Sequence, residues 1–184
     1  MQSKSFQVSN ACIFSSYNIA FNLLSKFGLL VEHSKTEIFH FSRMHGVFNL
    51  PPFDLSLLGG LVLYPKDIWK YLRFIFNRKL LFCQHIDFYA NKALLIVKCM
   101  KILDNSMRDF ILHQKWLLYR SCALPIALYG FQMWFYTKAL LMYPLKILGK
   151  LQRQATLWIS EAFKTALSAS IEAIAGLIPI HLYL

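Results

Sequence analysis

Acidic residues are scarce in this chain of 184 residues, and no two of them are adjacent. Nine Asp and Glu residues stand against 20 Lys and Arg, which gives a formal net charge of +11. Two-metal phosphoryl transfer needs several carboxylates held close together to bind the metal ions. The sequence offers no such cluster, so we expect no metal site. The excess of positive charge instead indicates an anionic partner, either nucleic acid or a lipid surface.

Sequence signatures of the common catalytic sites are missing as well. There is no GxSxG, HExxH or GxxxxGK[ST] motif, and Gly149–Lys150 lacks the earlier glycine of a phosphate-binding loop. The six histidines have no metal-ligating partners at a useful spacing, so we interpret them as ordinary core or surface residues. They are His33, His40, His45, His85, His113 and His181.

The chain has only four cysteines, and they are far apart. Cys12, Cys83, Cys99 and Cys122 form no CxxC pair, so free thiols in a reducing compartment are expected. Lys4 is not followed by a clean apolar core, so the sequence predicts no signal peptide. Together these features predict an intracellular protein, nuclear or cytoplasmic, that is not secreted.

Apolar residues are abundant, but long uninterrupted apolar runs are not. Hydrophobic residues make up 57% of the chain and the mean hydropathy is +0.42, whereas globular proteins typically contain ~45–50% apolar residues. The best candidate for a membrane span, Ser121 to Thr137, is interrupted by Pro125, Gly130 and Gln132. A small membrane protein is therefore the last-ranked alternative. The composition is equally that expected of part of a larger body or of a degraded coding sequence.

In the first half of the chain, the sequence predicts a short helix, short strands and a long loop. Residues Ser15 to Phe27 show a helical apolar stripe that Gly28 ends. Leu29–Val31 and Glu37–Phe41 are predicted strands with a polar turn between them. Glycines and prolines predict a loop from Arg43 to Lys66.

Trp69 to Phe76 is predicted to be a single strand. Both of its faces are apolar, so it should be sandwiched between other elements. Arg73 is the exception, because it shares one face with Trp69, Tyr71 and Ile75. Nothing in the local pattern requires a charge there.

From His85 onward the period of the apolar residues becomes helical. The triplet Asp104–Asn105–Ser106 is predicted to break this first helix of the second half. The stripe that we expect to be buried consists of Ile86, Tyr89, Ala93, Val97 and Met100.

Two more long helices complete the prediction. The second should run from Arg108 to Tyr136 with a bend at Pro125, and the third from Pro144 to Phe163. The predicted fold class is therefore α+β and mostly helical. Short helix and strand elements fill residues 1–82, and a helical region fills residues 83–184.

Basic residues form rows on the predicted helices. Lys98 and Lys101 share a face of the first, and Lys146, Lys150 and Arg153 follow at i, i+4 and i+7 on the third. Such rows can follow the phosphates of a nucleic acid, and binding then weakens steeply with salt. They also occur on solvated helix faces, and the sequence alone leaves both interpretations open.

Three segments together resemble a known family. They are FGLLVEHSKTEIFHFS, then WKYLRFIFNRKL with the following HIDFYANKAL, and LYRSCALPIALYGFQMWF. Their order and spacing resemble the region that follows the catalytic acidic pair in LINE-type (non-long-terminal-repeat) reverse transcriptases. The likeness spans the chain from about Tyr17 to Ile180. It implies the C-terminal end of a polymerase palm over residues 1–82 and a thumb-like region over residues 83–184.

The resemblance also implies roles for individual residues. Lys35 matches a lysine that lies near the incoming nucleotide in the family. Tyr71, Leu72 and Arg73 match the Tyr-Leu-Gly hairpin that supports the primer end. The basic rows, which are Lys98, Lys101, Lys146, Lys150 and Arg153, would follow the RNA/DNA template–primer duplex.

The chain departs from the family at the positions that matter for catalysis. The metal-binding aspartates that hold Mg²⁺ in the intact family are not in this sequence, and neither are the fingers. Arg73 stands where the hairpin has glycine, a residue that lets the backbone bend or approach closely. We therefore expect a truncated reverse-transcriptase fragment, inactive alone, without a cofactor, and made to pack on an upstream polymerase portion. The alternative is a non-catalytic nucleic-acid-binding module.

Overall fold

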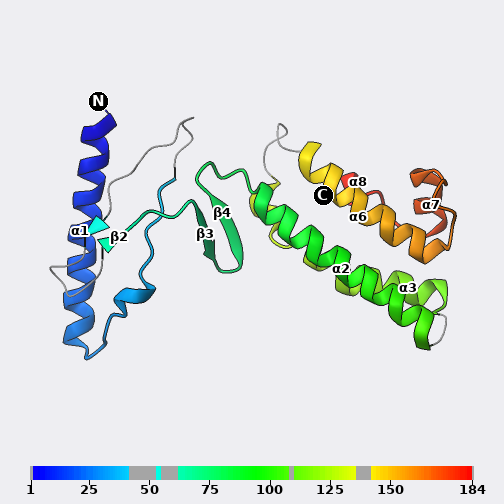
Figure 1. The fold of residues 1–184 in the computed structure, drawn as a ribbon, viewed down its shortest axis with the longest axis horizontal. Coiled ribbons are helices and arrows are strands. Elements are labelled where there is room, and N and C mark those ends of the chain that lie inside the picture. Colours follow the sequence, from blue (N-terminus) through cyan, green and yellow to red (C-terminus); the bar gives the residue numbers. More distant parts are fainter. Residues whose placement is uncertain (1, 42–52, 55–61, 108–109, 136–141, 184) are drawn as a thin grey trace. The chain divides into compact units, whose positions relative to one another are not determined.

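The computed structural model describes residues 2–41, 53–54, 62–107, 110–135 and 142–183 (Figure 1). The chain forms two compact units, Met1–Ile68 and Trp69–Leu184. Helices dominate, and the described strands form two small two-stranded sheets. This confirms the predicted α+β, mostly helical class. The division between the units falls after Ile68, the first residue of the β3–β4 hairpin, whereas the boundary predicted from sequence falls at residue 82.

Helix α1 (Gln2–Lys26) begins well before the predicted start at Ser15. No glycine or proline interrupts residues 2–14, so a helix formed further along the chain can extend backwards through them. The predicted end is confirmed. Gly28 has a φ of 71°, its N–H donates to the Ser25 carbonyl, and Leu29 N–H donates to the Leu24 carbonyl. These bonds make a Schellman motif, for which a glycine with positive φ is the favoured residue.

The two strands predicted after α1 are wrong. The chain instead forms a short 3₁₀ helix, η1 (His33–Lys35), and Phe39 makes only an isolated parallel bridge with Lys66. Two short strands, β1 (Phe53–Asp54) and β2 (Val62–Leu63), pair antiparallel further along. The remainder of the predicted loop, residues 43–52 and 55–61, lies outside the described residues.

The single strand predicted over Trp69–Phe76 is also wrong, because the backbone reverses in its middle. Strand β3 (Ile68–Tyr71) pairs with β4 (Phe74–Asn77), and Leu72 and Arg73 between them have φ values of 47° and 67°. Two central residues with positive φ are the signature of a type I′ hairpin turn. Arg73 is therefore at an exposed tip and not on an apolar face.

Helix α2 (Cys83–Met107) confirms the predicted stripe, since all five residues in it are at least 92% buried. The break predicted at Asp104–Ser106 is wrong. Asp104 is buried and accepts hydrogen bonds from the Phe110 backbone N–H and the Trp158 indole N–H. Because these tertiary partners satisfy its carboxylate, Asp104 does not compete with the helix backbone.

The predicted second helix is confirmed only in its central part, and residues 108 and 136 at its ends lie outside the described residues. Pro125 lacks an N–H, and its ring would clash with the Ser121 carbonyl in a regular α-helix. A π-helical segment absorbs the clash: Leu124 N–H donates to the Tyr119 carbonyl, one residue further back than in an α-helix. The order is α3 (Leu112–Leu118), η3 (Tyr119–Ala123), α4 (Leu124–Ala127) and α5 (Phe131–Trp134).

Helix α6 (Met142–Ser160) corresponds to the predicted third helix and lies beside α2 (Figure 1). Tyr143 donates a hydrogen bond to Asp87 near the start of both helices, and Trp158 donates to Asp104 near their ends. The two helices therefore run parallel. Two short helices follow, α7 (Ser168–Ile174) and α8 (Ile180–Tyr183).

Candidate nucleic-acid interface

Two tyrosines, Tyr89 in α2 and Tyr129 in the turn between α4 and α5, hold the turn of the β3–β4 hairpin. The Tyr89 hydroxyl of α2 donates to the Arg73 carbonyl at 2.9 Å, and the Tyr129 hydroxyl donates to the Leu72 carbonyl at 3.2 Å. Both acceptors are backbone atoms of the turn, so the Leu72 and Arg73 side chains remain exposed. The hairpin tip is thus a rigid projection that presents a cation.

His85 joins the hairpin to the helices from inside the core. Its side chain is 1% exposed, its Nδ1 accepts the Ile75 N–H at 3.3 Å, and its Nε2–H donates to the Tyr129 carbonyl at 3.0 Å. These roles require the neutral imidazole. Burial lowers the pKa of His85, and the hydrogen bond to Tyr129 only partly opposes this effect. The expectation that His85 is a core residue is therefore confirmed.

The turn between α4 and α5, which carries Tyr129, requires a glycine at position 130. Gly130 has a φ of 67°, and a Cβ added there would lie 2.3 Å from the Phe74 ring. Phe74 in turn stacks on His85, with ring centroids 5.1 Å apart and planes 9° apart. Only glycine fits this contact between the hairpin and the α4–α5 turn.

The hairpin carries both aromatic rings and positive charge, with Lys70 on the face of β3 opposite to Trp69 and Tyr71. Trp69 and Tyr71 stack with ring centroids 4.9 Å apart, and Tyr71 is 53% exposed. Lys70 lies 5.9 Å from the centre of the Phe88 ring, and Arg73 is exposed at the tip. Stacked aromatics beside cations are a common arrangement for contacting nucleic-acid bases and backbone.

Most of the charge belongs to the second unit. Residues 69–184 contain 15 of the 20 Lys and Arg and five of the nine Asp and Glu, so they carry +10 of the net +11. The side chains of Lys98 and Lys101 on α2, and of Lys146 and Lys150 on α6, are exposed. Because α2 and α6 run parallel, both predicted rows lie along the same helical layer.

Arg153 differs from the other members of its predicted row. Its guanidinium donates to the Lys164 carbonyl at 2.8 Å, to the Ala166 carbonyl at 3.1 Å and to the Ser168 hydroxyl. It fixes the segment between α6 and α7, which is a structural role. Its part in binding nucleic acid stays a prediction.

Lys35 is the remaining predicted site residue. It is exposed at the end of η1, in the first unit. Leu72, Arg73 and the basic rows belong to the second unit.

A buried charge network was not found from the sequence. Lys115 is 2% exposed and pairs with Asp104 at 2.9 Å and with Glu161, which has a φ of 54° just after α6. Burial opposes both charges, but their mutual hydrogen bonds outweigh it, lowering the pKa of Asp104 and raising the pKa of Lys115. The network borders a polar cleft of about 490 Å³ lined by Lys101. No local sequence pattern predicts this network, because Asp104, Lys115 and Glu161 are far apart in the chain.

Two other kinds of site are absent from the described ranges. No three His, Cys, Asp or Glu side chains come together there in a way that could hold a metal ion. Nor does any described helix have the length and apolar content needed to cross a membrane.

No protein-family model, curated protein or solved structure matches this chain. Its function must therefore be inferred from its residues and their geometry.

Proposed function

We propose that this chain is a palm-and-thumb-like segment related to LINE-type reverse transcriptases, which binds a nucleic-acid duplex and does not polymerise alone. The observation that carries the proposal is the contact between the family-like segments. His85 of the HIDFYANKAL segment bonds to Ile75 in the hairpin segment and to Tyr129 in the segment containing the Tyr-Gly pair. Two of the three family-like segments thus meet in one hydrogen-bonded core, while the first segment belongs to the other unit.

The conformation of Arg73 supports the same origin. The family has glycine at this position, and the backbone here has the positive φ that glycine favours. A hairpin that keeps a glycine conformation while carrying arginine is consistent with descent from a glycine-containing turn. The substitution stores strain in the turn and adds a charge to its tip.

Charge and exposure support duplex binding. The second unit carries +10, its α2 and α6 lysines are exposed, and the Trp69–Tyr71 stack belongs to the same unit. Contacts from such lysines to phosphates supply affinity without reading sequence. We therefore expect a sequence-independent interaction with an RNA–DNA hybrid.

Primer extension on a homopolymer template with Mg²⁺ tests the catalytic half of the proposal. We expect no incorporation by the pure chain, because its sequence lacks the family's metal-binding aspartates. Nucleotide incorporation by the pure chain would overturn this half. The same preparation should retard an RNA–DNA hybrid in a gel at low salt.

The genomic sequence upstream of Met1 tests the descent independently of any activity. An in-frame continuation that contains an aromatic-Asp-Asp signature would support a polymerase origin. An unrelated upstream sequence, together with hybrid binding, would favour the second candidate, a non-catalytic nucleic-acid-binding module, which the exposed lysines also support.

A further inference from the structure

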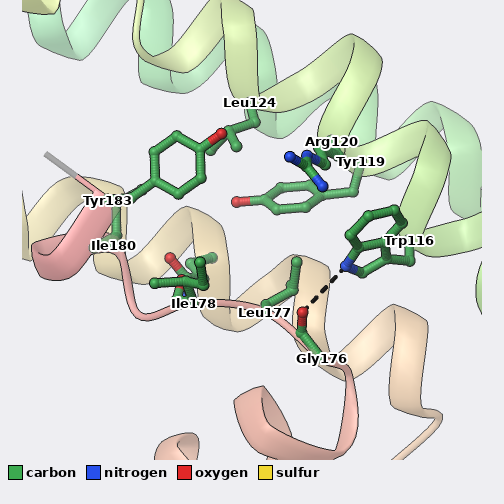
Figure 2. A pocket seen from close by; sticks show the side chains of 10 residues that line it. Trp116, Tyr119, Arg120, Leu124, Gly176, Leu177, Ile178, Ile180 and Tyr183 are labelled. Carbon is green, nitrogen blue, oxygen red and sulfur yellow. Dashed lines mark hydrogen bonds between the residues drawn. The ribbon is translucent and has the colours of Figure 1, made fainter.

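A cavity of about 70 Å³ lies where the C-terminal strap, residues 176–183, packs on α3, η3 and α4 (Figure 2). Side chains of Leu124, Leu177, Ile178 and Ile180 make its walls largely apolar. The other residues that line it are Trp116, Tyr119, Arg120, Gln152, Gly176 and Tyr183.

The Tyr119 hydroxyl is the unusual group in this cavity. The residue is 1% exposed, and within the described part of the chain its hydroxyl has no hydrogen-bond partner. Figure 2 shows the hydroxyl directed towards the side on which Tyr183 and Ile178 lie. Burial raises the pKa of Tyr119, so the phenol stays protonated and is available as a donor. A buried donor without an acceptor is unfavourable, which points to an acceptor that enters from outside.

Two of the other polar side chains at the cavity already make hydrogen bonds. The Trp116 indole N–H donates to the Gly176 carbonyl at 3.2 Å, and the Gln152 amide donates to the Ile178 carbonyl at 3.0 Å. The Tyr183 hydroxyl and the Arg120 guanidinium make no hydrogen bond or ion pair within the described residues, and the guanidinium lies 5.0 Å from the centre of the Trp116 ring. Three available donors, one of them cationic, therefore line a single apolar cavity.

We propose that this cavity binds a short-chain carboxylate. The carboxylate accepts a hydrogen bond from the Tyr119 hydroxyl and faces the Arg120 guanidinium, and the hydrocarbon part lies among the leucine and isoleucine side chains. An apolar cavity of roughly 150 Å³ admits benzene, so a cavity of about 70 Å³ suits a chain of about three carbons. This inference is independent of the proposed binding of nucleic acid.

Propionate is the probe for the test, added to the full chain at constant ionic strength. The readout is the indole N–H signal of Trp116 in the NMR spectrum, assigned with Trp116→Phe. We expect a saturable shift, at least roughly tenfold weaker binding in Tyr119→Phe, and a similar loss in Arg120→Gln. Glu172 disfavours negative charge at Tyr119, so Glu172→Gln should tighten binding. Tyr143→Phe, which removes a hydroxyl outside the cavity, should bind as the unchanged chain does.

Propionamide, which has the same shape without the charge, should bind more weakly than propionate. The proposal is overturned if propionate produces no saturable shift, or if Tyr119→Phe binds it as tightly as the unchanged chain. It is equally overturned if Lys146→Gln, on the exposed face of α6, weakens binding as much as Arg120→Gln does.

Discussion

The imidazole Nε2–H of His85 donates a hydrogen bond to the backbone carbonyl of Tyr129 across 3.0 Å, although 44 residues separate the two in the chain. The other ring nitrogen accepts a hydrogen bond from the N–H of Ile75. One neutral side chain therefore links the hairpin to the turn between α4 and α5. The geometry of the hairpin tip therefore depends on the protonation state of His85.

We expect the stability of the chain to fall at acidic pH because of His85. Burial lowers its folded-state pKa below the ordinary value of 6.5. The stabilising contribution is therefore complete above that value and is lost as the pH falls through the lower folded-state pKa. Urea unfolding followed from about pH 8 to about pH 5 should show a decline that His85→Gln reduces. The same pH dependence in both proteins would contradict this assignment.

Replacing Arg73 with glycine should stabilise the hairpin. Arginine at a φ of 67° is strained, and glycine is not, so we expect Arg73→Gly to raise the free energy of unfolding by about 0.5–1 kcal/mol. The urea midpoint measures the change. Lys70→Gly, within strand β3, is the matched control and should lower the free energy of unfolding. A destabilised Arg73→Gly would show that the turn has a different conformation.

Gly28 and the α2 stripe could be predicted from the local sequence pattern, whereas the hairpin turn was implied only by the family resemblance. A glycine after a helix and an apolar repeat on it act through neighbours a few residues away. The pair Leu72–Arg73 contains none of the residues that signal a type I′ turn, so the local pattern indicated one continuous strand. The tyrosines that hold this turn come from residues 89 and 129, far along the chain.

The candidate site, too, could be predicted only where local spacing along the chain determines it. The exposed lysines of α2 and α6 were predictable, because helical spacing alone places them on a face. The structural role of Arg153 was not, since it depends on the carbonyls of Lys164 and Ala166 beyond the end of α6. Asp104, interpreted as a helix break, is a partner of Lys115, and only the tertiary fold brings the two together.

Removing the buried cation should be strongly destabilising. Lys115→Met leaves the carboxylate of Asp104 buried without its ion pair, so we expect the free energy of unfolding to fall by about 3–5 kcal/mol. Lys150→Met removes an exposed charge and should change stability by about 0.5 kcal/mol or less. Chemical denaturation of the two variants compares them directly. Equal effects would mean that the Lys115 network does not form.

The isolated chain should be poorly soluble and should bind dyes that report exposed apolar surface. Phe88, Leu95 and Ile102 recur every seven residues on α2 and are 49%, 59% and 67% exposed. Ile102→Lys, within this exposed row, should reduce dye binding and aggregation. A monomeric preparation with a cooperative melt and no dye binding would contradict the expectation that this surface is made to be covered.

The salt dependence of RNA–DNA hybrid binding tests the central claim most directly. The account predicts binding at low salt and a linear fall of log K with log salt concentration. A variant with glutamine at Lys98, Lys101, Lys146 and Lys150 should show a shallower slope, by roughly 0.9 for each phosphate that a lysine no longer neutralises. Lys26→Gln, at the end of α1, is the control and should leave the slope unchanged. Absence of binding at low salt, or an unchanged slope in the four-lysine variant, would contradict the account.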